Sequence, residues 1–195
     1  MSIRMTPKFA LPLLLTFASS VAGAVCVPVI GTARLLPDAA CTIRTVAQPG
    51  TPASLFGGDC FSVQLSLAGF PAATGYAGNT IEPMASLVPG APATVAPVAV
   101  PAVGSPLPRQ IVQTARTTMW LGHGARRTAI YTTDVVVIQP QLSATGQVVP
   151  KLMTEQILIS GSDGKGAFAN VSGHLNVMGT TVGAPSAVTG QICMP

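Results

Sequence analysis

The stretch IVQTARTTMWL, residues 111–121, is followed after a short Gly-containing turn by TAIYTTDVVVI, residues 128–138. Both segments are rich in Val, Ile and Thr, the residues favoured in β-strands. Similar segments follow at 147–160 and 167–178, and a last one spans 187–194. Because glycine-bearing turns separate them, we expect consecutive strands to pair as an antiparallel meander.

An earlier strand, FSVQLSL at residues 61–67, shows the clearest alternation in the chain. Four apolar residues alternate with Ser62, Gln64 and Ser66, a pattern typical of a strand with one buried face and one wet face. No segment has a convincing helical period. The sequence therefore predicts an all-β fold, a single small antiparallel β-barrel closed by its last strand, with a β-sandwich as the alternative.

Composition agrees with short strands and many turns. Charged residues make up 8% of the 195 residues, against about 25% in typical globular proteins, and there are 20 glycines and 18 prolines. A mean hydropathy of +0.54 argues against a disordered chain. The length suits one domain, and the scattered basic residues form no stripe for nucleic acid, so we expect no nucleic-acid partner.

The first 24 residues have the pattern of a secretory signal peptide. Arg4 and Lys8 precede an apolar run over 9–21, and Ala22-Gly23-Ala24 supplies the small residues of a cleavage site. The apolar run is shorter than a membrane span and contains a proline. We expect cleavage near Ala24, a mature domain over 25–195 with no stable membrane span, and a secreted or periplasmic location.

All four cysteines lie in the predicted mature domain. An even number of cysteines in an exported chain indicates disulfides rather than metal thiolates, so we expect two bridges and no metal site. Three pairings are open. In each of them the late cysteine joins a partner in the first third of the domain, which ties the last strand back to the start. The four residues are Cys26, Cys41, Cys60 and Cys193.

The segment 71–108 is dominated by Pro, Ala and Val and carries almost no charge. Proline at this density removes backbone donors that a sheet interior needs. We therefore expect a long loop or edge segment here. We expect a loop of this length to pack along the surface, to bind something or to be mobile.

The stretch GSDGKGAFANVSGHL, residues 161–175, resembles the late hairpin of the allene oxide cyclase and dirigent-type β-barrels. In those families a glycine-rich turn precedes Gly-x-Phe, a small residue, Ser/Thr-Gly and an apolar strand. The resemblance implies a barrel in which Phe168 fills the core and Gly173 relieves crowding at a strand bend. It implies at most a cavity for an apolar small molecule, because no motif for the enzymatic residues of those families is visible.

Asp134 is the most informative acid, because it lies inside the apolar strand over 128–138. If it points inward, burial raises its pKa unless an arginine pairs with it. Arg116, Arg126 and Arg127 are the candidate partners. Glu155 lies near the entry of the next strand, and with His174 these acids are the candidate catalytic residues.

Other chemistry-bearing residues have simpler interpretations. His123 lies between two glycines and suits a hairpin tip, while His174 suits an outward strand position. Trp120 and Tyr131, near one hairpin end, are ordinary core residues or, with Asp134, the wall of a ligand pocket. Nothing in the sequence calls for a cofactor.

Three hypotheses for function follow. The first is an exported, non-enzymatic β-barrel that binds a small apolar ligand or a surface partner. The second is an enzyme of cyclase or isomerase type that uses a carboxylate in the cavity, such as Asp134. The third is an envelope structural or interaction protein that acts through its Pro-rich segment.

Overall fold

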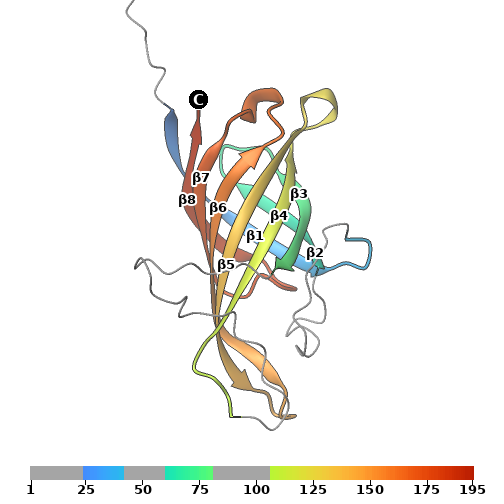
Figure 1. Ribbon diagram of the computed structural model, residues 1–195, viewed down its shortest axis with the longest axis vertical. Helices are drawn as coiled ribbons and strands as arrows, with labels where there is room; N and C mark the ends of the chain where they lie inside the picture. The colour runs from blue at the N-terminus through green and yellow to red at the C-terminus, as the bar shows by residue number, and fades with distance from the viewer. Residues whose placement is uncertain (1–23, 42–59, 81–105) are drawn as a thin grey trace, which may run out of the picture.

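The computed structural model describes residues 24–41, 60–80 and 106–195. These residues form a closed barrel in which each strand pairs antiparallel with the next in sequence, and the last strand pairs with the first (Figure 1). The predicted all-β barrel is thus confirmed, rather than the sandwich. Its strands are β1 (Val25–Pro37), β2 (Cys60–Leu67), β3 (Ala73–Thr80), β4 (Ile111–Leu121), β5 (Thr128–Leu142), β6 (Val148–Ser162), β7 (Ser172–Met178) and β8 (Ser186–Met194).

Alternation along the strands determines which side chains fill the barrel. In β2 the four apolar side chains are buried, while Gln64 and Ser66 are exposed, as the sequence predicts. In β5 the even-numbered positions from Thr128 to Ile138 are buried, and this inward row includes Asp134. One face of each strand therefore forms the core, and a carboxyl group occupies one of its positions.

Two disulfides stabilise the barrel. Cys26 of β1 bonds to Cys193 of β8, its direct register partner, so the seam that closes the barrel is covalent. Cys41 bonds to Cys60 at the start of β2. The predicted bridge from the last strand to the start of the domain is confirmed. Disulfides of this kind indicate an oxidising, extracellular environment.

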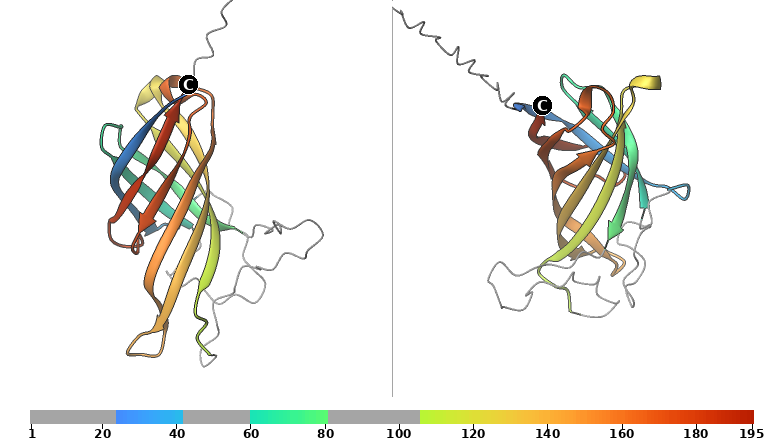
Figure 2. Two further views of the ribbon diagram at one scale, coloured as in Figure 1. Left: turned by 90° about the vertical axis from the view of Figure 1, so that its left-hand side faces the viewer. Right: turned by 45° about the horizontal axis from the view of Figure 1, so that its top comes forward.

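The two ends of the barrel differ. The β5–β6 hairpin projects past the other strands at one end, which we call the hairpin end (Figures 1 and 2). At the opposite end the rings of Phe70 and Phe168 lie 6.2 Å apart and pack against the hydrophobic core. Phe168 was expected to fill the core, and it is a partly buried residue that packs against it.

Glycines allow neighbouring strands to approach closely at Gly75 and at Gly173. A Cβ atom at Gly75 would collide with the carbonyl oxygen of Thr118, and one at Gly173 would collide with that of Gln191. Gly173 also has a φ of 145°, which other residues rarely adopt. The close approach of β7 and β8 at Gly173 agrees with the expected relief of crowding there.

The interpretation of 71–108 as a loop or edge segment is wrong for Ala73–Thr80, which form β3 between β2 and β4. The remainder of the Pro-rich segment up to 105 lies outside the described residues, as does nearly all of the expected signal peptide. Where the sequence suggested strand from 167, a short 3-10 helix (Gly166–Phe168) precedes β7. Over the described ranges the chain contains no helix long and apolar enough to cross a membrane.

Candidate functional site

Two acidic side chains are buried inside the barrel on neighbouring strands. Asp134 of β5 is fully buried and Glu155 of β6 is 8% exposed. In the strand register Glu155 faces Val136, so it is one inward position nearer the hairpin end than Asp134. Diagonal neighbours of this kind lie close enough to interact. The structure thus brings together two of the three candidate catalytic residues.

Hydroxyl groups surround the deeper acid. The Thr117 hydroxyl donates a 2.7 Å hydrogen bond to Oδ2 of Asp134. The other carboxyl oxygen, Oδ1, has no partner, and neither has the nearby hydroxyl of Thr132. A second buried hydroxyl without a partner belongs to Thr181. Buried polar atoms usually have a hydrogen-bond partner, so these unpaired atoms set this part of the interior apart.

Burial changes the acidity of both carboxyl groups. Burial raises the pKa of Asp134 from 3.8 to about 6, and the Thr132 and Thr117 hydroxyls limit that rise. Only Thr117 makes a hydrogen bond, so we assign it the larger share. Burial, together with the negative charge of Asp134, raises the pKa of Glu155 to about 8. Near neutral pH the pair therefore holds one proton, on Glu155, and one negative charge, on Asp134.

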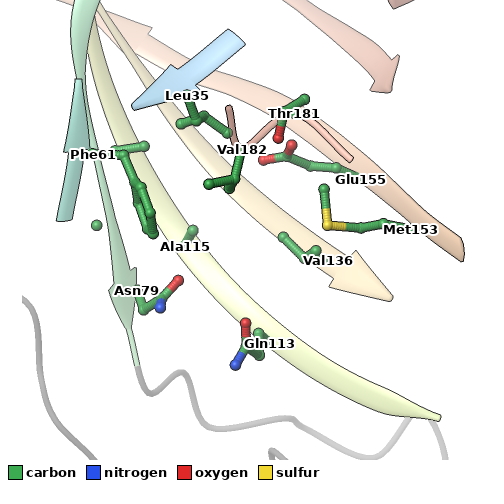
Figure 3. A pocket seen from close by; sticks show the side chains of 12 residues that line it. Leu35, Phe61, Asn79, Gln113, Ala115, Val136, Met153, Glu155, Thr181 and Val182 are labelled. Atoms are coloured by element: carbon green, nitrogen blue, oxygen red, sulfur yellow. The ribbon is translucent and has the colours of Figure 1, made fainter. Parts of the chain in front are cut away.

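A small cavity of about 40 Å³ lies beside Glu155 toward the hairpin end of the barrel (Figure 3). Its volume exceeds the roughly 10–15 Å³ needed for one water molecule, and it is far smaller than a site that encloses a whole drug-sized ligand. Apolar side chains dominate its wall, and amides and hydroxyls supply a few polar groups. The lining residues are Leu35, Phe61, Ala77, Gly78, Asn79, Gln113, Ala115, Val136, Met153, Glu155, Thr181 and Val182.

The loop between β7 and β8 supplies one wall of this cavity. Val182 forms a parallel bridge with Leu35 of β1, and the Leu35 amide donates to the carbonyl of Thr181 at 2.9 Å. These contacts hold the loop against the barrel wall. In Figure 3 the Thr181 side chain points toward the carboxyl group of Glu155. A loop therefore places a hydroxyl beside an acid that belongs to a strand.

The arginines expected near Asp134 do not lie beside it. Arg116 is exposed on β4, and its neighbour Ala115 is the residue that faces Asp134. Arg126 and Arg127 are exposed in the turn after β4. Burial and neighbouring hydroxyl groups, not an arginine, shape the pKa of Asp134, so the idea of an arginine-paired structural carboxylate is wrong.

The histidines lie away from the acid pair. His174 is exposed on β7, outward as expected, and it shares no cavity with Asp134. His123 is exposed next to the short 3-10 helix at the turn after β4, as predicted for a hairpin tip. In the described part of the chain no group of three or more His, Cys, Asp or Glu residues could hold a metal ion.

The two aromatic residues proposed for the ligand pocket face outward. Tyr131 is 41% exposed. Trp120 lies between the inward residues Met119 and Leu121, and it borders a hollow on the outer surface. Both the core interpretation and a shared pocket with Asp134 are wrong for this pair. The alternation of β4 and β5 puts them on the side opposite the acid.

Several groups around the acids were missed from the sequence. Thr117 lies two residues before the inward Met119, and Thr132 lies two residues before the inward Asp134. Because alternate residues of a strand point to the same side, the sequence could have predicted that both threonines point inward. Thr181 has no such signal, because it reaches the site from a loop.

No family model, curated protein or solved structure matches this chain.

Proposed function

We propose that this protein is an exported binding barrel that takes up one polar end of a small, mostly apolar molecule beside Glu155. The observation that carries the proposal is a buried carboxyl group, without a basic partner, in the wall of a small apolar cavity. With a pKa of about 8, Glu155 is mainly protonated at neutral pH and can donate a hydrogen bond. A carbonyl or hydroxyl oxygen is the matching acceptor.

The size of the cavity limits what enters. About 40 Å³ accommodates a small polar group but not a whole ligand, so the apolar part extends toward the hairpin end. Leu35, Phe61 and Met153 supply apolar contacts along that path. Burial of apolar surface then contributes affinity, and the hydrogen bond to Glu155 contributes orientation.

Two sequence features support this proposal. The predicted signal peptide and the two disulfides suit a secreted or periplasmic protein. The resemblance of residues 161–175 to allene oxide cyclase and dirigent-type barrels points the same way, since such barrels often hold apolar small molecules.

The test compares 2-heptanone with 2-methyl-1-heptene, which replaces the carbonyl oxygen by a CH₂ group of similar shape. Binding is followed by NMR through the methyl signal of Met153. We expect saturable shifts with the ketone and binding at least about fivefold weaker with the alkene, as expected for loss of one buried hydrogen bond. Glu155→Gln keeps a hydrogen-bond donor and should therefore retain the preference for the ketone over the alkene. Glu155→Leu removes the donor and should abolish that preference.

Gln156→Leu is the matched control, because Gln156 is the next residue on β6 and is exposed. It should leave the preference for the ketone unchanged. Equal affinity for the two probes, or an unchanged preference in Glu155→Leu, would refute the proposal. Far-ultraviolet circular dichroism shows whether each variant is folded.

A second candidate function is proton transfer next to a carbonyl, as in an isomerase or cyclase. It is favoured by one observation: burial, together with the charge of Asp134, raises the pKa of Glu155 to about 8, which suits a general acid or base near neutral pH. Incubation of 2-heptanone with the protein in D₂O tests this idea. Exchange of the hydrogens next to the carbonyl above the buffer rate, lost in Glu155→Gln, would indicate an enzyme. Binding without exchange would indicate a carrier.

A further inference from the structure

A second hollow, separate from the Glu155 cavity, lies on the outer face of β2, β3 and β4. Its volume is about 390 Å³, within the range of small-molecule sites. Two aromatic residues, one arginine and several hydroxyl and amide groups border it, and its lining includes no acidic residue. The lining residues are Ser62, Val63, Gln64, Thr74, Gly75, Tyr76, Trp120 and Arg127.

The aromatic residues form a fixed corner. The rings of Tyr76 and Trp120 meet edge to face, with centroids 6.0 Å apart and an interplanar angle of 87°. This geometry is a favoured one for aromatic pairs. Trp120 is partly buried on β4, directly opposite Thr74 of β3. The corner therefore offers an apolar surface held by two paired strands.

Arg127 adds a positive charge to this corner. Its guanidinium carbon lies 4.7 Å from the centre of the Trp120 ring. A guanidinium stacked on an aromatic ring keeps its in-plane N–H groups available, and their fork geometry matches a carboxylate. The stacking also restrains the long arginine side chain. Less entropy is then lost when an anion binds.

We propose that this hollow binds a carboxylated sugar ring, such as a uronic acid residue of a glycan. The carboxylate pairs with Arg127, a C–H face of the ring packs at the Trp120 corner, and the sugar hydroxyls bond to Gln64 and Thr74. A fatty acid fits less well, because about half the hollow's border is polar and nothing covers an apolar tail. A phosphate fits less well, because Arg127 is the single basic residue among the described residues that border the hollow.

Intrinsic fluorescence reports on this site directly, since Trp120 is the single tryptophan of the chain. Sodium glucuronate is titrated at constant ionic strength, with glucose and sodium acetate as comparison probes. We expect a saturable change with glucuronate and at least tenfold weaker responses with glucose and acetate. An equal response to acetate, an equal response to glucose, or no saturation would overturn the proposal.

Arg127→Gln and Arg126→Gln form a matched pair, because both residues are exposed in the same turn and only Arg127 borders the hollow. We expect Arg127→Gln to weaken glucuronate binding about tenfold, as for loss of a charge-assisted contact, and Arg126→Gln to leave it unchanged. An equal loss of glucuronate affinity in both variants would show that the positive charge of the turn attracts the anion without a specific contact to Arg127. That result would overturn the proposal.

If Arg127→Gln does not fold, Gln64→Ala at the exposed far side of the hollow replaces it. The expected loss is then about threefold, typical of one neutral hydrogen bond. Unchanged binding in Gln64→Ala would overturn the assignment of the sugar hydroxyls. None of these residues borders the Glu155 cavity. The outcome of this test therefore does not depend on whether the proposal for the Glu155 cavity is correct.

Discussion

Asp134 and Glu155 lie on paired strands, both directed into the barrel and displaced from each other by one inward position. Neither acid has a basic neighbour that shapes its pKa. No basic group therefore offsets the negative charge of Asp134, and this charge, together with burial, raises the pKa of Glu155.

Replacement of Asp134 by Asn should lower the pKa of Glu155 from about 8. The substitution removes the negative charge that opposes ionisation of Glu155, while burial keeps the pKa above the ordinary 4.5. Titration of the Glu155 carboxyl carbon by ¹³C NMR measures the shift. Asp163→Asn, in the turn after β6, is the control and should change nothing. An unchanged Glu155 in Asp134→Asn would mean that the acids do not interact.

Stability should fall as the pH rises from about 4 to 8. The pKa values of both acids are raised on folding, so the folded state binds more protons than the unfolded state over this range, and the free energy of unfolding decreases with pH. The total change is of the order of a few kcal/mol. Urea denaturation at a series of pH values measures it. In Glu155→Gln the decrease should be much smaller and confined to the range below about pH 6. A wild-type curve that rises over this range would contradict the protonation states given above.

Removal of the disulfides should have unequal effects. The Cys26–Cys193 bridge spans 167 residues of sequence, and the Cys41–Cys60 bridge spans 19. In the chain-entropy model the longer loop contributes about 2 kcal/mol more to stability. Urea denaturation of the two double Ser variants measures the difference. A larger loss from Cys41→Ser/Cys60→Ser would show that the seam between β1 and β8 needs no covalent support.

Gly75→Ala should destabilise the barrel by about 1–3 kcal/mol, the usual cost of overpacking. The added methyl group would meet the carbonyl oxygen of Thr118, which is backbone and cannot rotate away. Gly161→Ala is the matched control, because space is open there and its φ is not positive. Thermal unfolding of the two variants compares them. Equal melting temperatures would show that β3 and β4 can separate at little cost.

The sequence predicts much of the barrel because hydrophobic alternation is strong in most strands. The bounds expected for β4, Ile111–Leu121, are those observed. β3 was missed because it reads ATGYAGNT, with small and polar residues in place of large apolar ones. Its Gly75 allows the close approach of β4, a requirement set by the neighbouring strand rather than by local propensity.

The acids of the site could be predicted, but their surroundings could not. The apolar neighbours of Asp134 in β5 indicate burial, whereas its partners depend on strand register. Register places Ala115 opposite Asp134 and leaves Arg116 outside. Likewise, the role of Thr181 depends on a loop that folds against β1, which no periodicity signals.

The bond between Cys26 and Cys193 makes residues 26–193 a covalent ring. A protease that cuts this ring once opens it without releasing a fragment, and both new ends stay attached to strands that remain paired. Two cuts are needed before a piece can leave, unless the Cys41–Cys60 bridge also holds it. In an extracellular environment, where proteases are common and chaperones are few, the barrel can therefore survive a nick that would divide an open chain in two.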